Sequence, residues 1–292
     1  MRNNQDRLGM GAPTDNLQGN HEPPAAPAAS PMQFIVPTEI VDLPSKGLFY
    51  EEGHPLHGRE TIEIRHMTTK EEDILTNQSF IKNGIAIDKL LQSVLVEPKM
   101  KVRDMLVGDK NALTVACRIY GYGPEYQTKF SCPSCGETQQ HTFDLSELEH
   151  NNYLDNLSEF NAEVNYDKQT VMLPIPRTNT KLELRLLKDD EDVSTTRKGK
   201  KAALNKFSII KHYERMIYSV NGNSDRTYIK SYISNMSALD SRFLRSAYGE
   251  IIPGVDFSCN FDCDSCGHDD EVEVPLNAEF FWPKSRISKK RI

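Results

Sequence analysis

The chain has 292 residues, of which 38% are hydrophobic and 26% charged, proportions typical of a soluble protein with one or two cores. Its formal net charge of −7 gives no general support for nucleic-acid binding. Most of its six cysteines stand in Cys-x-x-Cys pairs of a long chain, a pattern that favours metal binding over a disulfide framework.

Residues 1–33 are rich in Pro, Ala, Asn and Gly and hold few large apolar residues, so they predict a disordered arm. The segment lacks the cationic start and the apolar core of a signal peptide. No stretch of the chain approaches the roughly 18 apolar residues of a membrane span. We therefore expect a protein that is neither exported by that route nor membrane-spanning.

Residues 34–128 predict an N-terminal α+β region. "TIEIRH" alternates polar and apolar residues with period two, which predicts a strand. The run "TTKEED" predicts a helix that starts at Thr68 or Thr69, with acidic residues in its first turn. "IAIDKLLQSVLV" has the apolar spacing of a helix with one buried face, and "GDKNALTVACRIYGYG" predicts a further helix that ends at one of its last glycines.

Residues 146–255 predict strands followed by helices. Strands are expected near 162–166, 170–175 and 181–187, within "AEVNYDKQTVMLPIPRTNTKLELRLL". The apolar stripe in "FSIIKHYERMIYSV" predicts one helix, and residues 226–248 predict a second helical segment.

Two stretches repeat one pattern: "KFSCPSCGETQQHTFDL" at 129–145 and "DFSCNFDCDSCGHDDEVEVPL" at 256–276. Each has a Cys-x-x-Cys-Gly turn, in which two thiolates point at one ion and glycine permits the tight backbone. One turn supplies half of a tetrahedral site, so two turns supply all of it. The predicted ligands of a structural Zn²⁺ are Cys132, Cys135, Cys263 and Cys266.

The spacing of the two turns is unusual. A compact zinc ribbon separates its turns by roughly 15–20 residues, whereas residues 136–262 intervene here. The site is therefore expected to join distant parts of the chain, with 129–145 and 256–283 as paired hairpins around an insertion at 146–255.

Alternatives remain open at this site. Cys259 aligns with Cys132 in the repeated "FSC", and His268 follows the last turn, so either could replace a predicted ligand. A redox pair is disfavoured by the two copies and by the lack of a thioredoxin-like βαβ setting. Four thiolates leave no open coordination position, which disfavours catalytic zinc. The lone Cys117 is expected to be a small buried hydrophobe.

A nucleic-acid-binding zinc ribbon is the alternative function, but acidic residues around the second turn would repel phosphates. They are Asp256, Asp262, Asp264, Asp269, Asp270, Glu271 and Glu273. The basic run at 197–201 is interpreted as a solvated connector, and the basic tail at 284–292 is a weak signal for nucleic acid. The sequence holds no Gly-rich phosphate loop, no Gly-x-Ser-x-Gly and no His-Glu-x-x-His, so no enzymatic activity is predicted.

"DLPSKGLFYEEGHPLHGRETIEIRHMTTKEEDILTN", "IKNGIAIDKLLQ" and the closing "VPLNAEFFWP" resemble the baseplate protein family of T4-like contractile-tailed bacteriophages. Members of that family are described as baseplate hub subunits or hub assembly proteins. The resemblance is strongest over 34–130 and 255–283. It implies a non-enzymatic structural or assembly component that binds other phage baseplate hub and tail proteins, in the host cytoplasm during assembly and in the virion tail baseplate.

These observations predict an α+β protein of mixed helices and short antiparallel strands. A zinc-ribbon-like four-cysteine site closes it, and a disordered N-terminal arm precedes it. The segment "LPSKGLFY" is expected either to pack onto the protein's own core or to face a partner subunit.

Overall fold

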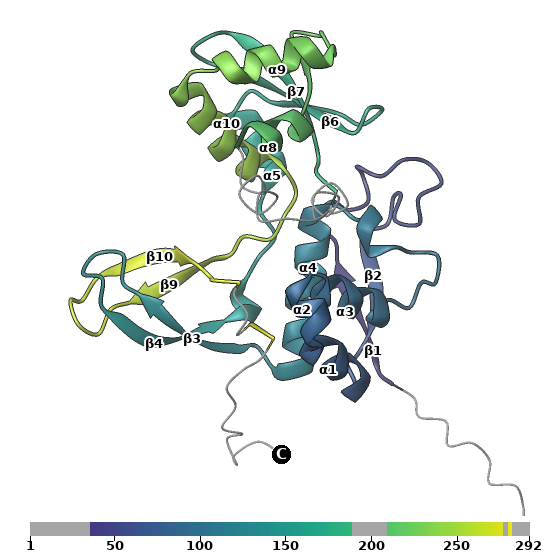
Figure 1. The fold of residues 1–292 in the computed structure, drawn as a ribbon, viewed down its shortest axis with the longest axis vertical. Coiled ribbons are helices and arrows are strands. Elements are labelled where there is room, and N and C mark those ends of the chain that lie inside the picture. The colour runs from purple at the N-terminus through teal and green to yellow at the C-terminus, as the bar shows by residue number, and fades with distance from the viewer. Residues whose placement is uncertain (1–35, 189–208, 277–279, 282–292) are drawn as a thin grey trace, which may run out of the picture. The chain divides into compact units, whose positions relative to one another are not determined.

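The computed structural model describes residues 36–188, 209–276 and 280–281 (Figure 1). It contains helices and short antiparallel sheets, which confirms the mixed α+β class. The expectations for the N-terminal arm, for the basic connector at 197–201 and for the basic tail at 284–292 concern residues outside these ranges. Within these ranges, no helix combines the length and the apolar character needed to cross a bilayer.

The first part of the chain forms a two-stranded sheet and a group of helices. Its elements are β1 (Thr38–Asp42), β2 (Thr61–Arg65), α1 (Thr69–Thr76), α2 (Gln78–Lys82), α3 (Ala86–Val94), a 3₁₀ turn (Val102–Asp104) and α4 (Val107–Tyr122). Ile62 and Ile64 of β2 are buried, as the period-two pattern predicts. Leu90, Leu91 and Val94 of α3 are completely buried, and α3 packs against α1 and α4, as the helical spacing predicts.

The "LPSKG" segment between β1 and β2 packs onto the protein's own core. Gly47 has a φ of +71°, and a Cβ there would lie 2.4 Å from the backbone nitrogen of Arg59, so the turn requires glycine. Ser45 donates its backbone N–H and its hydroxyl to the buried Asp109 carboxylate, at 3.0 and 2.7 Å. The Tyr50 hydroxyl donates to the same carboxylate at 2.6 Å. Asp109 lies in the first turn of α4, so this network fixes the segment to that helix.

Two antiparallel hairpins carry the Cys-x-x-Cys turns. Their strands are β3 (Glu125–Ser131) with β4 (Thr138–Asp144), and β9 (Ser258–Asp262) with β10 (Asp269–Glu273). Each pair forms its own two-stranded sheet. Figure 1 shows the two hairpins next to one another, in agreement with the contacts between β4 and β9. Most residues of these strands are exposed, so the hairpins bury few side chains.

The residues between the hairpins form a four-stranded antiparallel sheet, in the order β5-β6-β7-β8, with helices packed on it. The elements are a 3₁₀ turn (Leu145–Glu147), α5 (Tyr153–Glu159), β5 (Glu163–Asn165), β6 (Thr170–Ile175), β7 (Thr180–Arg185), α8 (Ile209–Met216), β8 (Ile217–Val220), α9 (Arg226–Asn235) and α10 (Ala238–Ile251). The three strands predicted at 162–187 are confirmed as β5, β6 and β7.

Two predictions in this region are wrong in detail. The single helix predicted in "FSIIKHYERMIYSV" ends at Met216, and the following residues form β8. Ile217 and Val220 pair with β7 and are fully buried, because β-branched side chains pack well on a sheet whose neighbouring strand is available. The helical segment predicted at 226–248 is two helices, since the Ser237 side chain accepts the Asp240 N–H at 3.1 Å and caps α10.

Candidate metal centre

Both Cys-x-x-Cys turns have the same backbone geometry. The N–H of Gly136 donates to the carbonyl of Cys132, and the N–H of Gly267 donates to the carbonyl of Cys263, each at 2.9 Å. Both glycines have positive φ, +74° and +68°, which lets the chain turn back under the sulfurs. The first cysteine of each turn also donates its N–H, at 2.9 Å, to the carbonyl of the residue after the glycine. The repeat in the sequence is thus a repeat in structure.

The two turns bring four sulfurs together. The Sγ atoms of Cys132, Cys135, Cys263 and Cys266 all lie within 4.8 Å of one another. The Sγ atoms of Cys132 and Cys266 are 3.8 Å apart, and those of Cys135 and Cys263 are 3.7 Å apart. Four thiolates at about 2.3 Å from a tetrahedral ion are about 3.8 Å from one another, whereas a disulfide requires about 2.05 Å. The cluster therefore has the dimensions of a metal site and could hold a metal ion.

Further contacts between the hairpins support this arrangement. The Gln139 amide, on β4, donates to the carbonyl of Asp262 at 2.8 Å and accepts the backbone N–H of Asp264 at 3.0 Å. The rings of Phe130 and Phe261 pack with their centroids 4.8 Å apart, and Phe261 is fully buried. One amide side chain therefore aligns the second turn with the first, and a small aromatic cluster lies behind both.

The electrostatics of the four thiols favour a bound cation. Burial raises the pKa of Cys132, but the backbone N–H groups of Cys135 and Ser134 and the neighbouring sulfurs lower it to about 6. The backbone N–H of His268 lowers the pKa of Cys266, but the neighbouring thiols, Cys135 foremost, raise it to about 12. One thiolate therefore opposes the ionisation of the others. A central divalent cation removes that repulsion, and an all-thiolate donor set suits Zn²⁺.

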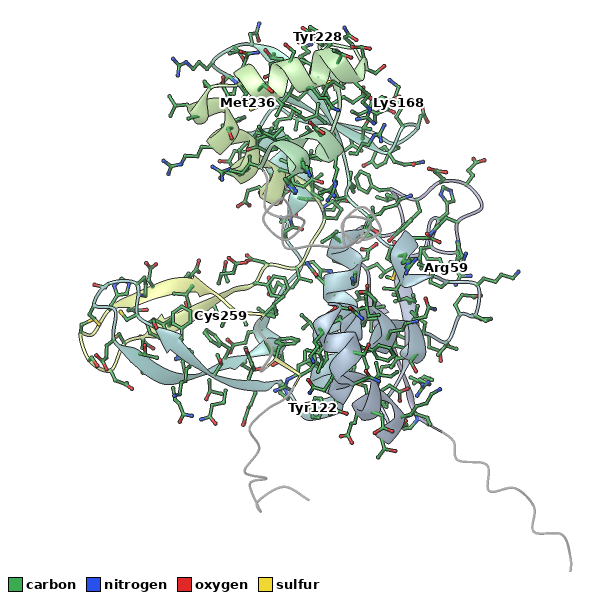
Figure 2. All side chains as sticks on the ribbon, viewed as in Figure 1. Arg59, Tyr122, Lys168, Tyr228, Met236 and Cys259 are labelled. Carbon is green, nitrogen blue, oxygen red and sulfur yellow. The ribbon has the colours of Figure 1, made fainter. Side chains whose placement is uncertain are left out.

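The base of the hairpin pair is tied to α4 by a buried arginine. Arg118 is 1% exposed; its Nε donates to the Phe280 carbonyl at 2.7 Å, and its terminal nitrogens donate to two carbonyls at the start of the first hairpin. Its guanidinium also lies 5.6 Å from the ring centroid of Tyr122. Tyr122, the last residue of α4, is labelled in Figure 2. The Tyr126 hydroxyl donates to the Pro275 carbonyl at 3.0 Å. These bonds connect the start of the first hairpin to the segment after the second.

The other candidate ligands lie outside the sulfur cluster. Cys259 (Figure 2) stands opposite Val272 in the second hairpin, where burial raises its pKa. The Nε2 of His268 is 3.7 Å from the Asp270 carboxylate. Cys117 is 2% exposed within α4, as expected of a small buried hydrophobe, and burial raises its pKa to about 12.

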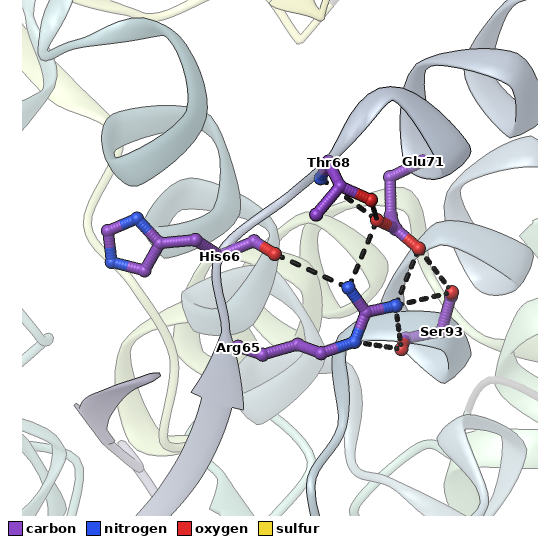
Figure 3. A network of polar contacts seen from close by, with 5 residues as sticks. All are labelled: Arg65, His66, Thr68, Glu71 and Ser93. Carbon is purple, nitrogen blue, oxygen red and sulfur yellow. Dashed lines mark hydrogen bonds and ion pairs between the residues drawn. The ribbon is translucent and has the colours of Figure 1, made fainter. Parts of the chain in front are cut away.

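A second group of charged and polar side chains surrounds Glu71 and connects elements of the N-terminal part. Glu71 is fully buried and accepts from both terminal nitrogens of Arg65, at 2.6 and 3.1 Å (Figure 3). It also accepts from the hydroxyls of Thr68 and Ser93, at 2.7 and 2.6 Å. Burial raises its pKa, but Arg65, Ser93 and Thr68 together lower it to about 2. The carboxylate therefore links β2, α1 and α3 and is held by several donors at once.

Sequence reasoning missed the organising role of Glu71, Asp109 and Arg118. The spacing Thr68-x-x-Glu71 is that of a capping box and could have indicated Glu71. Arg118 has no such local signal, because one of its acceptors, Phe280, is far away in the sequence.

Comparison with known proteins identifies a protein family. The model of a protein family described as "T4 bacteriophage base plate protein" matches residues 37–282, which is most of the chain. No curated protein and no solved structure matches.

Proposed function

This chain belongs to the T4 bacteriophage base plate protein family, and from that premise we propose that it is a non-enzymatic structural or assembly component of the baseplate hub. In this role it binds other phage baseplate hub and tail proteins. It acts in the host cytoplasm during assembly and, if it is a hub subunit rather than an assembly factor, in the tail baseplate of the virion. The family match over most of the chain is the observation that supports this proposal.

The proposed cofactor is one structural Zn²⁺, held by Cys132, Cys135, Cys263 and Cys266. The sulfur separations of 3.7 and 3.8 Å support it, since they match a tetrahedral thiolate site. When bound, the ion would supply a crosslink between the hairpins. Because the four thiolates fill its coordination, no position is left for a substrate, which supports a structural role.

The four ligand residues and the ion would form a crosslink between distant segments, which we call the clasp. Each turn presents two sulfurs from a rigid backbone, and Gln139 aligns the two turns. The clasp joins the hairpins at 129–145 and 256–283 and thereby fixes both ends of the insertion at 146–255. The result is a defined surface that a neighbouring baseplate protein can recognise.

The proposed role is tested by removing the protein from an infection. A phage whose copy of the gene carries a stop codon is expected to yield heads but no complete tails by electron microscopy, and supplying the protein from a plasmid should restore them. Mass spectrometry of purified virions beside assembly intermediates then separates a hub subunit from an assembly factor. Normal baseplates in the absence of the protein would contradict the proposal.

The alternative, a nucleic-acid-binding zinc ribbon, has less support. The acidic residues of the second hairpin are exposed around its turn and would repel phosphates. This alternative predicts salt-dependent DNA binding that is lost when residues 284–292 are removed. The hub role predicts no DNA binding even at low salt.

A further inference from the structure

A cationic pocket lies between β7, α8 and α9. Its volume is about 450 Å³, and its charged lining is Arg185, Lys211, Glu214, Arg215, Arg226 and Lys230. Five cationic side chains therefore converge with one carboxylate, in a chain whose net charge is −7. Such a concave concentration of one sign of charge attracts an oppositely charged partner.

Much of this positive charge is not neutralised within the described part of the chain. Lys211 and Lys230 form no ion pair with any described residue. Arg226 donates to the backbone carbonyl of Glu214, at 3.2 Å, rather than to a carboxylate. The guanidinium of Arg185 lies 4.6 Å from the ring centroid of Tyr218. The pocket thus offers several donors to an incoming carboxylate.

The β9–β10 hairpin offers the opposite charge. Residues 256–276 contain no Lys or Arg. Asp269, Glu271 and Glu273 are exposed and alternate along β10, so they share one face of the sheet at intervals of about 7 Å. Asp262 stands directly opposite Asp269 on the neighbouring strand, and like charges in that position destabilise a sheet. A cationic partner over this acidic face would relieve that repulsion.

We propose that the acidic face of the β9–β10 hairpin of one copy binds the cationic pocket of a second copy. The two surfaces lie on different elements, so the contact is head-to-tail. An open assembly therefore has one unused pocket at one end and one unused hairpin at the other, and it can add further copies or close into a ring. This contact is additional to the proposed binding of other baseplate proteins and does not depend on it.

The chemistry of the pocket edge favours a protein over a nucleic acid. Ile210 is 46% exposed on α8, one helical turn before Glu214, so an apolar side chain lies beside the charged wall. An apolar side chain contributes to a protein interface and has no use against a phosphate backbone. A strand with alternating carboxylates is complementary to the charges of the pocket.

The test is sedimentation velocity of the full chain over a range of concentrations. We expect self-association at about 50 mM NaCl that is lost at about 500 mM, because exposed charges are screened. The pocket variant Lys211→Glu/Lys230→Glu and the hairpin variant Asp269→Asn/Glu271→Gln should each weaken association at least about tenfold. Mixed together, they should form one-to-one dimers that do not grow, since one variant keeps its hairpin and the other keeps its pocket.

A matched double charge reversal, Lys89→Glu/Lys99→Glu, alters two exposed lysines of the N-terminal part and should leave association unchanged. Thermal melting of every variant confirms that it is folded. A chain that stays monomeric at all concentrations at low salt overturns the proposal, and so does a mixture of the two variants that forms no dimer.

Discussion

The N-terminal part and the paired hairpins achieve order by different means. In the N-terminal part, α3 and α4 bury apolar side chains, and Glu71 and Asp109 are surrounded by hydrogen-bond donors. The hairpins are two-stranded, largely exposed sheets, a type of structure that is marginally stable by itself in water. Burial of apolar side chains accounts for the order of the first region, whereas we propose that a metal ion between the two turns stabilises the second.

The two regions also differ in how far apart their contacting residues lie in the sequence. The sulfurs of Cys132 and Cys266 approach to 3.8 Å across 134 positions in the sequence, twice the reach of the Ser45–Asp109 bond, which spans 64. Loop-closure entropy rises only slowly with length, so a strong local interaction can hold even so distant a pair. A metal ion bound by four thiolates is such an interaction, and its binding is coupled to folding.

The largest expected effect is confined to the hairpins. Replacing Cys263 with Ser should release the metal and abolish hydrogen-exchange protection in β3, β4, β9 and β10, because their order depends on the site. Protection in α3 and α4 should persist, since a separate core stabilises them. Hydrogen exchange read by mass spectrometry measures both regions in one experiment.

Cys259 supplies a matched control in the same hairpin. Its sulfur lies outside the cluster, so Cys259→Ser should retain the metal and the hairpin protection. Equal loss of protection in the two serine variants would contradict the distinction between ligand and neighbour.

Arg118 joins the two regions, and its replacement should have the next largest effect. Arg118→Met leaves three backbone carbonyls without their donor and should lower the free energy of unfolding by about 4 kcal/mol. Urea denaturation measures this change. The exposed Arg245, changed to Met, should alter stability by less than about 0.5 kcal/mol; similar losses for both would indicate that the buried bonds contribute little.

Glu71 sets a pH dependence for the N-terminal part. Its pKa is lowered from 4.5 to about 2, so its contribution of about 3 kcal/mol is complete above pH 4.5 and is lost as the pH falls towards 2. Glu71→Gln should therefore be about 3 kcal/mol less stable than the native chain at neutral pH, and this difference should vanish near pH 2. Denaturation at several pH values tests it, with the exposed Glu72→Gln as control. A difference that does not vary with pH would contradict the buried ion pair.

The sequence predicts local structure well where one pattern operates alone. The alternation in "TIEIRH" and the apolar row of "IAIDKLLQSVLV" became β2 and α3, and both Cys-x-x-Cys-Gly turns have the expected geometry. The sequence predicts local structure poorly where residues far away in the chain determine it. Ile217 and Val220 continue a helical stripe, yet pairing with β7 makes them a strand. The acceptors of Arg118 likewise come together only in the folded chain.

The smallest expected effect concerns the contact between the two turns. Gln139→Ala removes two hydrogen bonds at a partly exposed position and should cost about 1 kcal/mol, with the metal retained. Its neighbour Gln140 is exposed and supplies the control. Chelator competition should show faster metal loss from Gln139→Ala than from Gln140→Ala; identical rates would show that the amide does not align the turns.

We propose that four cysteines from two distant hairpins hold one metal ion. Elemental analysis of the purified chain and of its Cys263→Ser variant tests it most directly. We expect one zinc per native chain and a loss of zinc from the variant. A native chain without metal, or a variant that retains zinc at full occupancy, would contradict it.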